Sequence, residues 1–146
     1  MNKNIRFEVF HGLDEHVYRY VAPYAMTMSY IKRNGNPITT SEKHSWYVGF
    51  DEDNQMVCFC SVKAQNKAKK MQIGNLFIFS REKKIFNLLV KKLIKDIASK
   101  GISLAAYANN ENKNWFVLLG FETVRTGVNW HNMKYNDRLR GNNKKT

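Results

Sequence analysis

The sequence predicts an α+β fold in which strands and helices share one core. Three observations support this prediction. From residue 75 to residue 121 the pattern runs strand, basic turn, long helix, strand and short helix. Residues 44–64 hold two strand-like runs joined by an acidic turn, which is typical of an antiparallel hairpin. The chain has 146 residues, of which 13% are aromatic and 25% charged, the size and composition of one globular domain.

The N-terminal part is expected to hold one strand and an interrupted helical region. Apolar residues alternate over residues 5–10, which favours a strand. Asp14 is a suitable N-cap for a helical region whose apolar face runs towards Asn34. Pro23 should split or kink this region at the preceding residue. Residues 34–41 are rich in turn formers and predict a loop.

The predicted hairpin comprises residues 44–51 and 55–64. In its first strand, Trp46 should share a face with Val48 and Phe50. Its second strand carries Cys58 and Cys60, which are too close in sequence for an ordinary disulfide and have no further cysteines with which to bind zinc. We therefore expect two small buried side chains and no metal site.

The next segment predicts a strand at residues 71–79 followed by a helix that ends at Gly101. Ser80 is a suitable N-cap and Glu82 falls in the first turn. One apolar stripe recurs along the helix at Ile85, Leu89, Leu93 and Ile97. A basic turn that opens directly into a helix directs free backbone N–H groups and the positive end of the helix dipole at one point. This arrangement predicts an anion site.

The C-terminal part predicts a strand at residues 102–107, a short helix that begins in an Asn-rich run and closes at Gly120, and strands at residues 122–126 and 128–135. The last residues are polar and basic. We expect a single domain over residues 1–136 and a disordered basic tail over residues 137–146.

The positive charge is concentrated in two places. Of the net charge of +12, residues 61–100 carry +9 and residues 134–146 carry +4. Such a field attracts an anionic nucleotide cofactor and, equally, a nucleic acid. The N-terminus lacks a signal peptide and the chain lacks an apolar run of transmembrane length, so we expect a cytoplasmic protein with no membrane partner.

Three motifs carry a resemblance to a known family. Arg81-Glu-Lys-Lys-Ile-Phe-Asn-Leu-Leu89 resembles the acyl-CoA pyrophosphate loop of the GCN5-related N-acetyltransferases (GNAT), which reads Arg/Gln-x-x-Gly-x-Gly/Ala before a Leu-rich helix. Asn109 matches the family's Asn after the fifth strand, and Phe116-Val-Leu-Leu-Gly-Phe121 is similar to its Tyr-x-x-x-Gly-Phe signature.

The chain departs from the family pattern at three positions. Lys84 and Phe86 occupy the two glycine positions of the loop, and Phe116 replaces the Tyr that often protonates the departing thiolate. Glycine lets the backbone approach a phosphate closely, so Lys84 must supply charge in place of contact or else block the site.

The resemblance implies a mixed, mostly antiparallel sheet of about six or seven strands flanked by helices in an α/β/α arrangement. It also implies an acyl-CoA-dependent N-acetyltransferase in which an amine attacks the thioester of acetyl-CoA directly. The implied cofactor contacts include the backbone of the strand end at residues 77–79. In full they are Phe77, Ile78, Phe79, Arg81, Glu82, Lys83, Lys84, Ile85, Phe86, Asn109 and Phe116.

Catalytic and acceptor residues are indicated less directly. The resemblance places His44 and Tyr107 on strands near the cofactor cleft, so they are the candidate catalytic residues, although surface or turn positions are expected for all four histidines. Trp46 and Trp130 are candidates for an aromatic acceptor pocket, against the usual role of such residues in the core.

The acceptor, a small-molecule or protein amine, stays open, and so does the choice between monomer and homodimer. The alternative function is a non-catalytic or nucleic-acid-directed protein of the same fold, either a binding module or an enzyme that modifies DNA bases. The lost glycines and the basic tail motivate this alternative.

Overall fold

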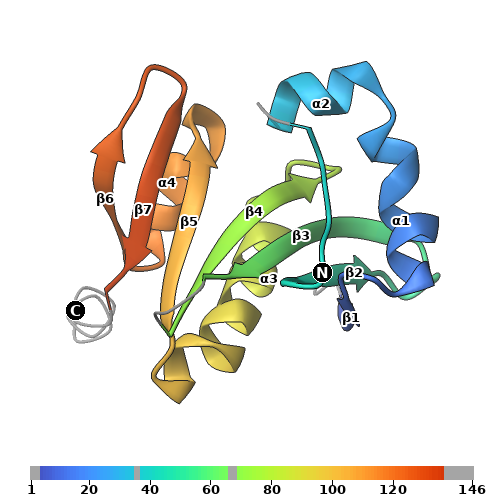
Figure 1. The fold of residues 1–146 in the computed structure, drawn as a ribbon, viewed down its shortest axis with the longest axis horizontal. Helices are drawn as coiled ribbons and strands as arrows, with labels where there is room; N and C mark the ends of the chain where they lie inside the picture. The colour runs from blue at the N-terminus through green and yellow to red at the C-terminus, as the bar shows by residue number, and fades with distance from the viewer. Residues whose placement is uncertain (1–3, 35–36, 66–68, 137–146) are drawn as a thin grey trace.

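The computed structural model describes residues 4–34, 37–65 and 69–136. Within these residues the strands form one seven-stranded sheet in the order β1-β2-β3-β4-β5-β7-β6 (Figure 1). Only β4 and β5 pair in parallel; the other neighbours are antiparallel. The predicted mixed, mostly antiparallel sheet is therefore confirmed. The strands are β1 (Arg6–His11), β2 (His44–Phe50), β3 (Met56–Ala64), β4 (Lys70–Ile78), β5 (Ser103–Asn109), β6 (Phe121–Thr126) and β7 (Trp130–Tyr135).

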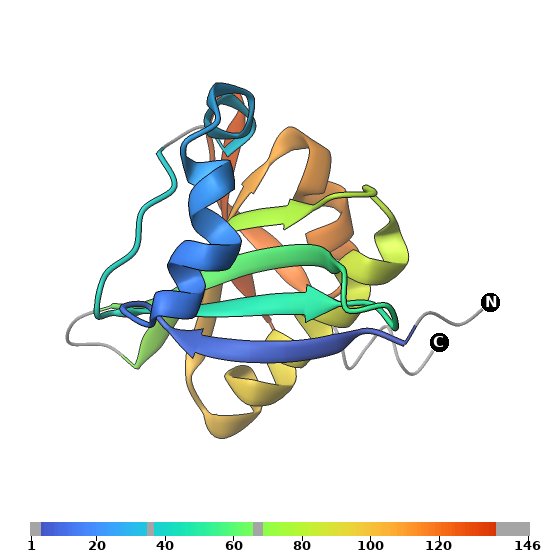
Figure 2. The same cartoon turned by 90° about the vertical axis from the view of Figure 1, so that its right-hand side faces the viewer.

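Helices cover both faces of the sheet, as the resemblance implied (Figure 2). One face carries α1 (Glu15–Ala25) and α2 (Met28–Asn34). The other carries α3 (Lys83–Asp96), the short 3₁₀ helix η1 (Ala98–Lys100) and α4 (Asn110–Leu118). None of the helices in the described ranges is long and apolar enough to cross a membrane.

The sheet therefore has a hydrophobic core on each side. Trp46, Val48 and Phe50 point from β2 towards α1 on one face, which confirms the predicted alternation, while Tyr47 packs on the opposite face with α3. Cys58 also lies on the α3 side, buried and free as expected, and burial raises the pKa of its thiol to about 12. Successive side chains of β2 are therefore buried on opposite faces of the sheet.

The helical region near the N-terminus begins as predicted but breaks later. The Asp14 side chain accepts the backbone N–H of His16 at 2.9 Å, so Asp14 is the N-cap. Pro23 lies inside α1, and the helix continues to its end at Ala25. The Thr27 hydroxyl then donates to the Pro23 carbonyl at 2.7 Å, and the chain turns into α2. Pro23 removes the one helical hydrogen bond that its N–H would donate, and the helix ends two residues later.

The start of α3 also differs from the prediction. The helix begins at Lys83, so Glu82 is its N-cap residue and Ser80 is not. Arg81 has a left-handed backbone, with φ of 59°, which adds a turn between Ser80 and the helix. The predicted helix also ends earlier than expected: α3 stops at Asp96, and Gly101, with φ of 81°, caps the separate 3₁₀ helix η1. The predicted tail, residues 137–146, lies outside the described residues, and its disorder stays a prediction.

Candidate functional site

The parallel strands β4 and β5 separate halfway along their length (Figure 1). Their paired register runs from Lys70 with Ser103 to Ile73 with Ala106, and both strands continue beyond it. Within the described structure, the edge of β4 that faces β5 therefore has no strand partner over residues 74–78. Every backbone N–H and C=O group needs a hydrogen-bond partner, and no strand supplies one along this edge. A ligand can therefore pair with these groups.

A bulge in β4 accompanies the separation. Phe59 of β3 pairs with Phe77, but Ser61 pairs with Gly74. An advance of two residues along β3 therefore corresponds to three residues along β4, which has one extra residue here. Asn75 lies in the bulge with a left-handed φ of 49°. An extra residue bends the strand and disrupts the ladder locally, which favours the divergence of β4 from β5.

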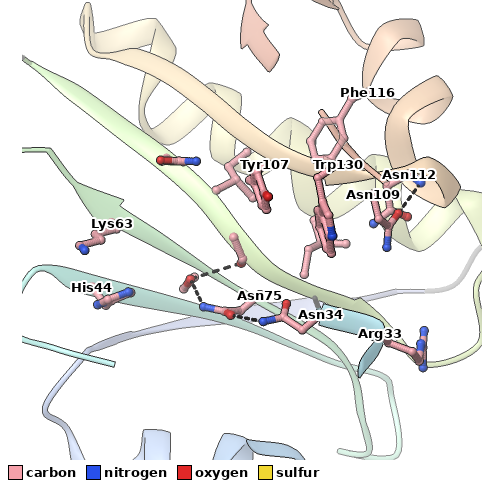
Figure 3. A pocket seen from close by; sticks show the side chains of 15 residues that line it. Arg33, Asn34, His44, Lys63, Asn75, Tyr107, Asn109, Asn112, Phe116 and Trp130 are labelled. Carbon is pink, nitrogen blue, oxygen red and sulfur yellow. Dashed lines mark hydrogen bonds between the residues drawn. The ribbon is translucent and has the colours of Figure 1, made fainter. Parts of the chain in front are cut away.

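Side-chain hydrogen bonds hold this bulge in place (Figure 3). The Asn34 amide of α2 donates to Asn75 Oδ1 at 2.8 Å, and Asn75 Nδ2 donates to Ser61 Oγ at 2.9 Å. The Ser61 hydroxyl in turn donates to the Gly74 carbonyl at 3.2 Å. The chain of bonds fixes α2, β3 and the bulge relative to one another.

A cavity of about 160 Å³ occupies the opening. Its walls come from α2, the near ends of β2 and β3, the bulge of β4, the end of β5, α4 and β7 (Figure 3). The lining residues are Arg33, Asn34, His44, Ser61, Lys63, Gln72, Ile73, Gly74, Asn75, Leu76, Tyr107, Asn109, Asn112, Phe116 and Trp130. The cavity therefore joins five residues predicted from the sequence: His44, Tyr107, Asn109, Phe116 and Trp130.

His44 and Lys63 lie side by side at one end of the cavity (Figure 3). His44 is 8% exposed, and its Nδ1 is 2.8 Å from Ser41 Oγ. Burial lowers the pKa of His44, and the positive charge of Lys63 lowers it further. The imidazole is thus neutral near pH 7 and can accept a proton.

Tyr107 and Trp130 form an aromatic wall of the cavity. Their rings are stacked with centroids 4.7 Å apart and planes within 1° of parallel. Tyr107 comes from β5 and Trp130 from β7, two adjacent antiparallel strands. Stacked rings of this kind offer a flat apolar surface to a ligand.

At the other end the cavity continues into a narrow space of about 20 Å³ that leads to Arg81. Arg33 borders both spaces, and its guanidinium lies over the Phe77 ring, 5.3 Å from the centroid. A volume of this size holds about one water molecule. The passage is therefore narrow where Glu111 and Trp115 line it.

The predicted anion turn lies beyond this passage. Glu82, the N-cap residue of α3, makes no side-chain cap hydrogen bond, so the first backbone N–H groups of the helix lack a side-chain acceptor from the cap. Lys83 and Lys84 are exposed beside them. Arg81 Nε lies 3.5 Å from Glu111 Oε1, so this cation is paired with a carboxylate of α4.

Several predicted cofactor residues have buried side chains. Phe77 and Ile78 are 2% and 5% exposed, and Phe79 packs against Tyr24 on the α1 side of the sheet. Ile85 and Phe86 are fully in the core beside α4. The buried side chains of Phe77, Ile78, Ile85 and Phe86 leave only the backbone of these residues for contact with a ligand, whereas Phe79 is partly exposed.

Asn109 serves as the N-cap of α4. Its Oδ1 accepts the backbone N–H of Asn112 at 2.8 Å, and the residue lines both the cavity and the narrow space. Its amide group can therefore donate to a ligand while the oxygen caps the helix. Phe116, from the same helix, is 1% exposed at the cavity wall and carries no acid group.

Two sequence-based expectations are wrong. Trp46 is fully buried and its indole N–H donates to Thr40 Oγ1 at 2.8 Å, and it does not line the cavity between β4 and β5. The α1 helix covers the face of β2 on which Trp46 lies. His44 and His131 are buried rather than surface residues, and His131 Nε2 lies 2.6 Å from Asn110 Oδ1. Among the described residues no cluster of three or more metal-ligating side chains occurs.

The sequence did not reveal several polar residues of the cavity. They are isolated in the sequence and come together only through the fold; they are Arg33, Asn34, Lys63, Gln72, Asn75 and Asn112. Asn75 alone carried a usable signal, because Asn is among the few residues that adopt a left-handed backbone readily.

Comparison with known proteins identifies the fold. No protein-family model and no curated protein matches the chain. ElaA of Escherichia coli has a similar structure, with a TM-score of 0.67 at 12% identity, over 91% of this chain and 100% of that one. An acyl-CoA N-acyltransferase from Pseudomonas aeruginosa gives 0.66 at 10%, with the same two coverages.

The PaiA N-acetyltransferase of Thermoplasma acidophilum, solved in complex with coenzyme A, is similar as well. It gives a TM-score of 0.63 at 16% identity, over 93% of this chain and 99% of that one. The chain therefore has the fold of the GNAT acetyltransferases, as the sequence resemblance predicted.

Proposed function

We propose that this protein is an acetyl-CoA-dependent N-acetyltransferase that acts on an amine. The separation of β4 from β5 carries the proposal, because it leaves an unpaired strand edge, a cavity beside it and the start of α3 at its far end. Proteins of similar structure include an N-acetyltransferase and an N-acetylglutamate synthase that were solved in complex with coenzyme A.

The residues of the site fit coenzyme A in chemical type. The free edge of β4 over residues 74–78 can pair with the amides of the pantetheine arm, as another strand would. The first turn of α3 and the cations of Arg81, Lys83 and Lys84 suit a pyrophosphate. Phe86 and Lys84 stand where the family has glycines. Because Phe86 points into the core and Lys84 into solvent, neither side chain occupies the space beside the backbone that a glycine would leave free for a phosphate.

The cavity can support direct transfer. Acetyl-CoA supplies an acetyl group activated as a thioester. The amine nitrogen attacks the carbonyl carbon, a C–N bond forms, the C–S bond breaks and the sulfur leaves as the CoA thiolate. Backbone N–H groups at the β4 bulge can donate to the carbonyl oxygen as it gains charge. His44 can accept the proton of the amine, directly or through water.

No side chain at position 116 can protonate the departing thiolate, because Phe116 stands there. A thiol of ordinary acidity is a good leaving group near neutral pH, so this proton can come from solvent. The proposal thus needs proximity, a backbone oxyanion site and one base, and no nucleophilic side chain.

Calorimetric titration with acetyl-CoA and with CoA tests the proposal. We expect binding to the unmodified protein, weakened by about fivefold in Arg81→Ala and in Lys84→Ala, as for the loss of one partly exposed ionic contact. Lys91→Ala, an exposed lysine of α3 that does not line the site, is the matched control and should bind normally. A folded protein that binds neither compound would refute the proposal.

A non-catalytic or nucleic-acid-directed role is the second candidate. Two observations favour it: the passage from the cavity to Arg81 is only about 20 Å³, and the Glu111 carboxylate lies beside that cation. Both oppose an anionic cofactor. Failure to bind acetyl-CoA, together with salt-sensitive binding of DNA or RNA, would support this candidate instead.

A further inference from the structure

The cavity between β4 and β5 is lined by cationic and neutral side chains. None of its 15 lining residues is Asp or Glu, whereas Arg33 and Lys63 are cationic. Glu111 borders only the narrow space, where its carboxylate is paired with Arg81. A cavity with cations and no carboxylate has a positive potential, which concentrates anions and repels cations.

We infer that the acceptor amine carries a negatively charged group, a carboxylate or a phosphate, and that Lys63 binds this group. The inference rests on the proposed function, because it assigns the end of the cavity away from Arg81 to the acceptor. It selects one chemical class from among the amines that an acetyltransferase of this fold could modify.

The two cations of the cavity have different surroundings. Arg33 lies over the rings of Tyr30 and Phe77 and borders the passage to Arg81, so it belongs to the cofactor end. Lys63 lies at the opposite end beside His44 (Figure 3). Among the described residues Lys63 has no ion-pair partner, and its side chain is exposed at the mouth of the cavity. Its ammonium group is therefore available to an anion.

The positive charge also favours the reactive form of the amine. A cation near an amine disfavours the protonated form and lowers the pKa of the amine. A protonated amine is repelled by the positive cavity. An acceptor with a carboxylate or a phosphate offsets this repulsion, because its anion pairs with Lys63 while its amine lies close to neutral His44. A polyamine or a lysine-rich peptide gains no such pairing here, because none of the described residues that line the cavity carries a carboxylate.

The aromatic wall of Tyr107 and Trp130 guides the choice of probe compounds. We would compare phenethylamine with derivatives that carry a carboxylate, a phosphonate in place of the phosphate, or an aminomethyl group on the carbon next to the amine, because Lys63 and His44 lie side by side. All four share a ring that can stack on the wall and differ in the charge beside the amine. Calorimetry measures their binding to the protein with and without CoA, and release of the CoA thiol measures transfer.

We expect one or both anionic derivatives to bind about fivefold more tightly than phenethylamine, and the aminomethyl derivative to bind least tightly, as for one screened charge interaction. Lys63→Glu should reverse this order. Lys91→Glu makes the same charge change on α3, outside the cavity, and should leave the order unchanged. The better of the two anions identifies the carboxylate or the phosphate as the preferred group.

Preference for the aminomethyl derivative would overturn the inference. An order of affinities that stays the same in Lys63→Glu would also overturn it. So would equal binding of all four compounds, or no binding of any of them. Because the amines are also titrated without CoA, this result is independent of the acetyl-CoA titration. Failure of the acceptor inference and failure of the proposed function are therefore separate outcomes.

Discussion

Replacing Glu111 with Gln is expected to strengthen the binding of acetyl-CoA. The Glu111 carboxylate lies 3.5 Å from Arg81 Nε, in the first turn of α4 and at the cofactor end of the proposed site. It partly neutralises the guanidinium and repels an approaching pyrophosphate. Glutamine keeps the size of the side chain and removes the charge, so Arg81 becomes fully available to the anion.

The size of the effect follows from the geometry of the pair. The Arg81 and Glu111 side chains are 63% and 48% exposed, so water screens them. Two unit charges about 3.5 Å apart attract each other by about 1 kcal/mol in water, and exposed ion pairs in proteins contribute between about 0.2 and 1 kcal/mol. The dissociation constant of acetyl-CoA should therefore fall by up to about fivefold.

Glu15→Gln is the matched control. Glu15 occupies the first turn of α1, as Glu111 occupies the first turn of α4, so both changes remove the same charge and a similar interaction with a helix dipole. Glu15 lines neither the cavity nor the passage. Calorimetric titrations should show tighter binding for Glu111→Gln alone, with a smaller gain at high salt. Weaker binding, or an equal gain in both variants, would refute the reasoning.

Two further predictions concern stability. A Cβ on Gly49 would lie 2.5 Å from Cys58 Sγ, so Gly49→Ala should lower the free energy of unfolding, measured by urea denaturation, by about 1 to 3 kcal/mol. In the control Gly74→Ala the new Cβ meets only Ser61 Oγ at 3.8 Å, so the free energy of unfolding should change little. Equal effects of the two substitutions would contradict this. Because burial and Lys63 lower the pKa of His44 below 6.5, the unfolded chain binds more protons near pH 6. The stability should fall as pH drops below about 6.5, and His44→Gln should lose this part of the pH dependence; identical pH profiles would exclude the mechanism.

The elements of the fold could be predicted because their signals are local. The alternation of Trp46, Val48 and Phe50 identified β2, and Gly101 marked the end of η1, which follows α3. Asp14 and the Asn-rich run identified two helix starts. Where a prediction missed, a neighbouring residue had changed the local geometry: the left-handed backbone of Arg81 moved the start of α3 beyond Ser80.

The site was predictable only in part, because packing decides which face of a strand stays open. Trp46 and Trp130 are the same residue type on strands, and both were candidates for the acceptor pocket. The α1 helix covers Trp46, whereas Trp130 stacks on Tyr107 beside the cavity. Nothing in the sequence near either tryptophan indicates where α1 lies.

The two halves of the proposed site are encoded in different ways, and this explains why the acceptor is harder to infer than the cofactor. The anion turn is one continuous segment, residues 80–86, so a motif can identify it even with its glycines replaced. The acceptor end exists because Asn34, Asn75 and Ser61 hold a bulge that keeps β4 apart from β5. Its chemistry depends on which isolated side chains then face the opening. That none of the described residues lining the cavity is Asp or Glu becomes apparent only once the cavity is assembled.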